Sequence, residues 1–162
     1  MTSTPLSRSR TSGQRGFSAT ELVVVVAVIG ILMAASAPFF LSAIRTSALK
    51  AGAEQLATVL GQARQMAIRD NTSICVVTNA GGVRFRVGGC GGAVWIGAGT
   101  DGAGFIRLAN NITVGPPAQV VVFTYIGTAN LAVPVPYVVT NPQDASTLSV
   151  SVAPSGRISI GP

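Results

Sequence analysis

The amino-acid sequence predicts an α+β fold, in which one long N-terminal helix packs on a C-terminal antiparallel β domain. Three observations predict it. An uncharged run extends from Leu22 to Ile44. A helical apolar stripe follows, as far as about residue 69. From Thr72 onward, short segments rich in β-branched residues alternate with Gly and Pro, which is typical of strands and turns.

Composition limits the function classes. The chain has 162 residues, which suits one domain plus an additional element. It has no histidine, the commonest acid–base catalyst and metal ligand. Charged residues make up 10%, and the net charge is +6. Arg8, Arg10 and Arg15 lie in the first sixteen residues, so the rest of the chain is only mildly basic and lacks the clustered charge typical of nucleic-acid binding.

The uncharged run is long enough to cross a bilayer as a helix, which takes about 20 residues. Arginines precede it, and Arg45 and Lys50 follow it; the positive-inside bias favours a cytoplasmic N-terminus. Three interpretations compete. The run is a plain membrane anchor, a secretory signal peptide cut after Ala35-Ser36-Ala37, or a segment preceded by a leader that is removed. Pro38, directly after the signal-peptidase cut, disfavours the second interpretation, as does an acidic residue at the head of the run.

That acidic residue is Glu21. A carboxylate inside a membrane helix costs about 2.5–3.5 kcal/mol on insertion scales. In the alternative interpretation, Glu21 has no specific function and its side chain extends to the membrane interface. However, the segment Gly16-Phe17-Ser18-Ala19-Thr20-Glu21-Leu22, preceded by the basic Arg15, closely resembles the prepilin peptidase site of type IV pilins.

The resemblance implies a role for each matching residue. The cut would fall after Gly16, and the new N-terminal residue, Phe17, would be N-methylated. Glu21 would be the fifth mature residue and would pair with the N-terminal amine of a neighbouring subunit during assembly. It would lie one turn from Phe17 on the same helix face, where the helix dipole favours a carboxylate. Pro38 falls at the family's helix-kinking proline.

An amphipathic helix is predicted beyond the membrane run. Its apolar positions recur at spacings of four and three, as one stripe suited to packing on a sheet: Leu49, Ala53, Leu56, Leu60, Ala63 and Ala67. Asp70-Asn71 is expected to close the helix, and Gly52 is a second candidate bend after Pro38. The predicted divisions are a leader at 1–16, an assembly and transmembrane helix at 17–44, an amphipathic helix at 45–70 and a β domain at 71–162.

The β domain is predicted to form one antiparallel sheet or two. A hairpin turns at residues 79–82. The Gly-rich stretch 88–104 is expected to be a mobile loop, and it lacks the lysine of a P-loop. The predicted strands are 73–78, 83–87, 93–96, 112–114, 119–125, 135–140, 148–152 and 157–160.

Two cysteines, Cys75 and Cys90, lie in this domain. Outside the cytoplasm a disulfide is expected; in the cytoplasm two free thiols are expected. A hairpin turn at Ala80-Gly81 places Cys75 opposite about Arg86. A bridge therefore requires Gly88-Gly89 to fold back, which two glycines permit.

The C-terminal part resembles the type II secretion protein H and FimT group of minor pilins. Matching pieces begin with Ala63-Arg64 and Ala67-Ile68 and include Asn71, Ile74-Cys75, Cys90, Trp95, Val122-Phe123, Gly127 and Ser155-Gly156-Arg157-Ile158. The resemblance implies a minor pseudopilin of type II secretion, or alternatively a minor type IV pilin. The implied partners are other pseudopilins or pilins in a filament, prepilin peptidase and an inner-membrane assembly platform. The chain would be single-pass, with its C-terminal domain in the periplasm.

Two other function classes are weighed against this. Some members of the group bind DNA through a C-terminal Gly-Arg-x-Arg motif; here Ser159 replaces the second arginine. The candidate nucleic-acid contacts are Arg84, Arg86, Arg107 and Arg157, and solvated strand faces explain them equally well. For an enzyme, the sequence offers no nucleophile–base pair. Asp70, Asp101 and Asp144 are isolated, and Asp101 alone is a weak calcium ligand. No cofactor and no metal are expected.

Overall fold

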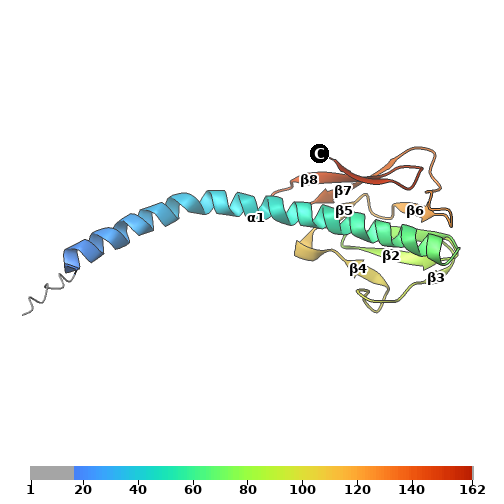
Figure 1. Ribbon diagram of the computed structural model, residues 1–162, viewed down its shortest axis with the longest axis horizontal. Coiled ribbons are helices and arrows are strands. Elements are labelled where there is room, and N and C mark those ends of the chain that lie inside the picture. Colours follow the sequence, from blue (N-terminus) through green and yellow to red (C-terminus); the bar gives the residue numbers. More distant parts are fainter. Residues whose placement is uncertain (1–16, 162) are drawn as a thin grey trace, which may run out of the picture. The chain divides into compact units, whose positions relative to one another are not determined.

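The computed structural model describes residues 17–161; the predicted leader, with Gly16 on one side of the predicted cut, lies outside them. One long helix, α1, runs from Ala19 to Arg69 and is followed by the strands (Figure 1). The chain divides into two compact units, one ending at Phe40 and one beginning at Leu41. Each unit is described by itself.

The first unit is the apolar start of α1. Leu22 N–H donates to the carbonyl oxygen of Ser18 at 3.1 Å, which closes the first helical turn. The hydroxyl of Ser36 donates to the carbonyl oxygen of Leu32 at 2.8 Å, which satisfies a polar group within the apolar run. The helix continues through Pro38.

The second unit contains the amphipathic part of α1, and the predicted apolar stripe is confirmed. All six stripe residues are buried, and Gly52, Val59 and Met66 join them on that face. The helix ends at Arg69, as predicted from Asp70-Asn71. Asn71 adopts a left-handed φ of 47°, and Thr72 N–H donates to the carbonyl oxygen of Ala67 at 3.1 Å. This arrangement satisfies carbonyl groups that the helix end leaves open.

The first sheet is antiparallel and five-stranded. Its order is β3-β2-β1-β6, and β4 also pairs with β2. The central hairpin has the predicted register, with Cys75 opposite Arg86. The strands are β1 (Ile74–Asn79), β2 (Gly82–Val87), β3 (Ala93–Val94), β4 (Phe105–Arg107) and β6 (Val120–Phe123).

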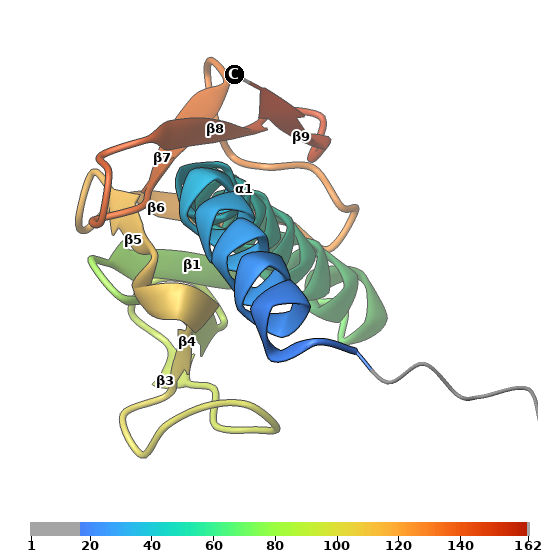
Figure 2. The same ribbon diagram turned by 90° about the vertical axis from the view of Figure 1, so that its left-hand side faces the viewer.

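The second sheet is also antiparallel, with the order β5-β7-β8-β9. A short 3-10 turn, η1 (Ala109–Asn111), leads into its first strand. Within the domain, β7 and β8 lie on one side of α1, while β2 and β4 lie on the other (Figures 1 and 2). The strands are β5 (Thr113–Gly115), β7 (Val135–Thr140), β8 (Thr147–Val152) and β9 (Ile158–Gly161).

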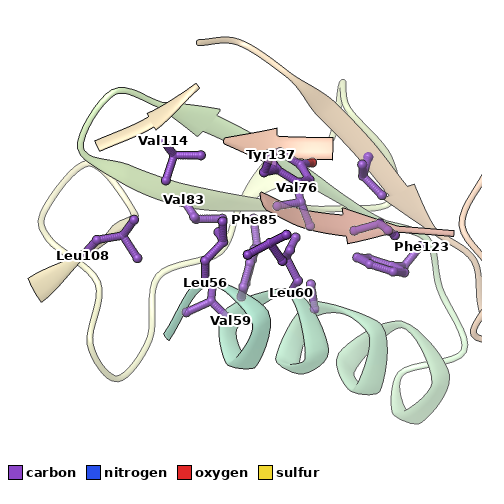
Figure 3. Close-up of a cluster of buried hydrophobic side chains, with 14 of the residues drawn as sticks. Leu56, Val59, Leu60, Val76, Val83, Phe85, Leu108, Val114, Phe123 and Tyr137 are labelled. Carbon is purple, nitrogen blue, oxygen red and sulfur yellow. The ribbon is translucent and has the colours of Figure 1, made fainter. Parts of the chain in front are cut away.

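One hydrophobic core joins the helix to both sheets (Figure 3). Leu56 and Leu60 of α1 are fully buried, as are Phe123 of the first sheet and Tyr137 of the second. Full burial of a side chain of this size contributes about 1.5–3 kcal/mol. The fold class predicted from the sequence, a long helix packed on antiparallel β structure, is therefore confirmed.

The Gly-rich stretch contains more structure than was expected. It holds β3, which lies within the predicted strand at 93–96, and β4, which the sequence analysis missed, begins directly after it. Asp101 organises the turn before β4, because its Oδ1 accepts hydrogen bonds from Phe105 N–H at 2.8 Å and from Ala103 N–H at 3.0 Å. Thr100 binds both backbone groups of Gly97 through its hydroxyl. Strand β4 was not predicted because it is three residues long and its partner, β2, is distant in the sequence.

Candidate functional site

The head of α1 carries the candidate assembly residue. Glu21 occupies the third position of the helix, and its Oε2 accepts a hydrogen bond from Ser18 N–H at 3.4 Å. The Ser18 hydroxyl lies 2.7 Å from that of Thr20. A glutamate that reaches back to the N-cap backbone forms half of a capping box. The sequence analysis did not assign Ser18, although Ser-x-x-Glu before an apolar run signals such a box.

The apolar side chains that follow Glu21 are not buried by the rest of the described chain. Every residue from Phe17 to Ile44 is exposed, including Phe17 at 79%. Among residues 17–161, α1 is the one helix long and apolar enough to cross a membrane by length and composition. Single exposed apolar residues are ordinary on soluble proteins, but a continuous surface of this extent indicates an interaction with lipid or with other helices.

The two cysteines are joined by a disulfide, with their Cα atoms 5.0 Å apart. The chain returns toward Cys75 at Gly88 and Gly89, which both have left-handed φ angles of 85° and 97°. Their N–H groups donate to the carbonyl oxygen of Ser73 at 2.8 and 3.1 Å. The turn that the sequence analysis required for a bridge is therefore present, and it uses the conformation that glycine permits at little cost.

Two of the four candidate nucleic-acid arginines lie together. The guanidinium of Arg84 lies 4.7 Å from the ring centroid of Phe105, and that of Arg107 lies 5.9 Å from it. Arg107 also forms an ion pair with Asp101 at 2.9 Å. The hydrogen bond from Phe105 N–H, followed by those from Arg107 and Ala103, holds the pKa of Asp101 below its usual range. These cations have partners inside the domain.

The other two candidate arginines, Arg86 and Arg157, do not join this pair. Arg86 donates from Nη1 to the carbonyl oxygen of Gly92 at 3.0 Å and so holds the cysteine-containing loop. Arg157 is exposed and precedes β9, in the second sheet. The four arginines therefore do not form one patch in the domain.

Three of the family-like fragments meet at one place. Arg64 of α1 donates from Nε to the carbonyl oxygen of Gly127 at 2.7 Å. Gly127 and Gly156 both have left-handed φ angles, of 82° and 78°. A Cβ at Gly156 would lie 2.9 Å from Nε of Arg64 and closer still to the Gly127 carbonyl, so the contact requires glycine there. Sequence analysis identified these fragments separately but did not predict that they meet.

The remaining two aspartates serve as turn residues. Asp70 pairs with the neighbouring Arg69 at 2.7 Å, and the hydrogen bond from that guanidinium lowers the pKa of Asp70. Asp144 accepts two hydrogen bonds from Ser146, through N–H at 3.1 Å and through the hydroxyl at 2.6 Å. Within residues 17–161, no three His, Cys, Asp or Glu side chains are grouped so that they could hold a metal ion.

Similarity to known proteins is found among solved structures. No family model matches the chain, and no curated protein matches it. Among solved structures, the type IV minor pilin FimU of Pseudomonas aeruginosa strain PAO1 is similar in two crystal forms. In the P21 form the identity is 20% with a TM-score of 0.49, over 70% of this chain and 88% of that one. In the P65 form the identity is 18% with a TM-score of 0.47, over 70% and 92%.

Proposed function

We propose that this chain is a minor pseudopilin of a bacterial type II secretion system, a structural subunit of the periplasmic filament that drives protein export. The observation that carries the proposal is that one chain combines two parts: an exposed apolar helical segment with one carboxylate at its head, and a domain in which the amphipathic part of α1 and both sheets share one core. Such a chain needs a membrane or other helices around its N-terminal part, but its C-terminal part folds in water.

The apolar helix is suited to two environments in turn. Before assembly, lipid covers the run from Leu22 to Ile44, since a segment of this length crosses the hydrocarbon layer. After assembly, the equivalent helices of neighbouring subunits cover it. Residue Pro38 is the proposed kink that adapts the helix to its neighbours.

Glu21 is the proposed assembly residue. It is the one charged group between Phe17 and Ile44, and retaining it in a bilayer costs about 2.5–3.5 kcal/mol. Prepilin peptidase would cut after Gly16, and Phe17 would become an N-methylated, cationic terminus. That amine on one subunit is the proposed ion partner of Glu21 on the next, which sets the register of the filament.

The topology follows from charge and sulfur chemistry. The basic N-terminal tail favours a cytoplasmic start, with the β domain on the other side of the inner membrane. The Cys75–Cys90 disulfide supports this orientation, because disulfides persist in the periplasm and are rare in the cytoplasm. The partners are other pseudopilins, prepilin peptidase and the inner-membrane assembly platform. We propose no enzymatic role and no nucleic-acid role, since Arg84, Arg86 and Arg107 are engaged within the domain.

The Glu21→Ala variant tests the assembly role, with Glu54→Ala as a matched control. Glu54 is an exposed glutamate on the same helix, beyond the membrane run. We expect E21A to remain in the membrane fraction, because the change removes a charge from the bilayer, but to be lost from isolated filaments. E54A should behave as the unaltered chain in both assays. Normal incorporation of E21A would remove the register role.

A minor type IV pilin has the same features and is the alternative. Deleting the gene separates the two. A pseudopilin deletion should abolish export of the secreted proteins and leave surface pili present, whereas a pilin deletion should reduce piliation and leave export intact. Complementation with the unaltered chain, but not with E21A, should restore whichever function is lost.

A further inference from the structure

A polar pocket of about 500 Å³ lies where the amphipathic part of α1 begins. Arg45 of the helix lines it, together with the carboxamides of Asn110, Asn111, Asn141 and Gln143. The asparagines come from η1 and from the loop after β7, so two segments far apart in the sequence meet the helix here. We call this the headgroup pocket.

The pocket is a built feature and not a gap between loops. Asn141 is 2% exposed. Its Oδ1 accepts a hydrogen bond from Gln143 N–H at 3.0 Å, and its Nδ2 donates to the carbonyl oxygen of Arg45 at 3.5 Å. Its backbone carbonyl accepts from Ala145 N–H at 2.9 Å. One buried carboxamide thus fixes the loop after β7 to the helix at Arg45.

Uncommitted hydrogen-bonding groups surround this fixed centre. Asn110 and Asn111 adopt successive left-handed φ angles of 59° and 58°, which asparagine tolerates better than most residues. In residues 17–161, the side chains of Asn110, Asn111 and Gln143 form no hydrogen bond with one another or with the rest of the domain. Their amide groups are therefore available as donors at the pocket.

The charges next to the pocket have opposite signs. The side chain of Arg45 is half-buried. The carboxylate of Asp144 is exposed, and hydrogen bonds from Ser146, with a smaller contribution from Arg45, hold its pKa below the usual range. No ion pair joins Arg45 to Asp144 among the described residues, so neither charge neutralises the other at contact distance. A zwitterion of matching length would complement both.

The position of Arg45 in the sequence indicates which class of zwitterion the pocket would meet. The uncharged run ends at Ile44, and Arg45 is the first charge after it. In a membrane-inserted chain, this turn lies at the level of the lipid headgroups, a step that rests on the proposed function. A guanidinium surrounded by amide donors suits a phosphate, which binds arginine in a bidentate manner.

We propose that the headgroup pocket binds a zwitterionic phospholipid, with the phosphate on Arg45 and the carboxamides and the ammonium group toward Asp144. Phosphatidylethanolamine has this chemistry. Binding would hold the β domain against the membrane while the subunit waits for assembly, and extraction of the helix into a filament would release the lipid.

The test measures lipid retention by native mass spectrometry on the full chain in detergent, with phosphatidylethanolamine or phosphatidylglycerol added. The unaltered chain should retain more phosphatidylethanolamine. Arg45→Gln should lower retention of both lipids roughly tenfold, since it removes a charge-assisted contact. Asp144→Asn should abolish the preference between lipids. The double change Asn110→Gly and Asn111→Gly removes the carboxamides but permits the left-handed backbone, and it should also lower retention.

Lys50→Gln is the matched control, because Lys50 is exposed, lies on the same helix and does not line the pocket. It should retain lipid as the unaltered chain does. Equal retention by R45Q, or displacement of the lipid by millimolar inorganic phosphate, would overturn the proposal. Flotation with vesicles distinguishes failure of lipid binding at the pocket from failure of membrane insertion. A chain that floats but retains lipid independently of Arg45 contradicts the pocket alone, whereas a chain that does not float contradicts membrane storage and the pocket together.

Discussion

Arg64 of α1 donates a hydrogen bond from its Nε to the carbonyl oxygen of Gly127, across 2.7 Å and 63 positions of sequence. Gly127 follows β6 and contacts Gly156, which precedes β9. One helix side chain therefore links the turn after the first sheet to the last turn of the second. The contact is part of the domain's structure and leaves less of Arg64 available for a ligand.

Replacing Arg64 by Ala should lower the free energy of unfolding by about 1.5–3 kcal/mol, since a partly buried, charge-assisted hydrogen bond is lost. Arg69→Ala is the control, because within residues 17–161 Arg69 pairs only with its exposed neighbour Asp70, so the change should have no measurable effect. Thermal unfolding followed by circular dichroism compares the two. Equal melting temperatures for the two variants would show that the Arg64 contact adds no stability.

Gly52 and Gly61 should respond oppositely to Ala. A Cβ at Gly52 would lie 2.9 Å from two side-chain carbons of Ile112, which is 1% exposed, whereas a Cβ at Gly61 would meet nothing within 4 Å. G52A should therefore lose about 1–3 kcal/mol through overpacking. G61A should gain about 0.5–1 kcal/mol from helix propensity. Chemical denaturation measures both changes. A stabilised G52A would mean that Ile112 can move away from the helix to make room for the added methyl group.

Tyr137 should make stability depend on alkaline pH. Burial raises the pKa of its hydroxyl above the ordinary value of 10.0. The hydroxyl has no hydrogen-bond partner among the described residues. The unfolded chain releases this proton more readily than the folded one. The free energy of unfolding is therefore unaffected by this group below about pH 10 and falls as the pH rises further.

Tyr137→Phe should remove this decrease in the free energy of unfolding at alkaline pH. At neutral pH it should raise the free energy of unfolding by about 1 kcal/mol, since an unpaired buried hydroxyl disappears. Tyr125→Phe is the control, because the Tyr125 side chain is 56% exposed and has no burial penalty to relieve. Urea unfolding at neutral and alkaline pH measures the free energy of unfolding of both variants and of the unaltered chain. A Y137F variant with the same alkaline loss as the unaltered chain would assign that loss to other groups.

Local patterns predicted most of the fold. The stripe from Leu49 to Ala67 was predictable because spacings of three and four place residues on one helix face. The register of Cys75 opposite Arg86 followed from the turn position alone, because antiparallel pairing is fixed once the turn is known. Expected strands at 135–140 and 148–152 correspond to β7 and β8 within one residue.

The parts that sequence analysis missed depend on contacts far along the chain. Gly52 was interpreted as a candidate bend, and the sequence did not predict its second role, which is to permit close packing of Ile112 on the helix. The role of Arg64 depends on where Gly127 is placed by the whole domain. The headgroup pocket joins Arg45 to Asn141 and could not be predicted from spacing, since nothing local relates them.

The central claim, that Glu21 and the apolar helix belong to a processed filament subunit, is tested most directly by the N-terminus of the mature chain. Mass spectrometry of membrane-extracted protein should show a chain that begins at Phe17 and carries one added methyl group. Gly16→Ala should still be processed, whereas a bulky residue at that position should block the cut. A mature chain that begins at Pro38 would instead establish a secretory signal peptide, and an intact chain that begins at Met1 would establish a plain membrane anchor; either result would contradict the account.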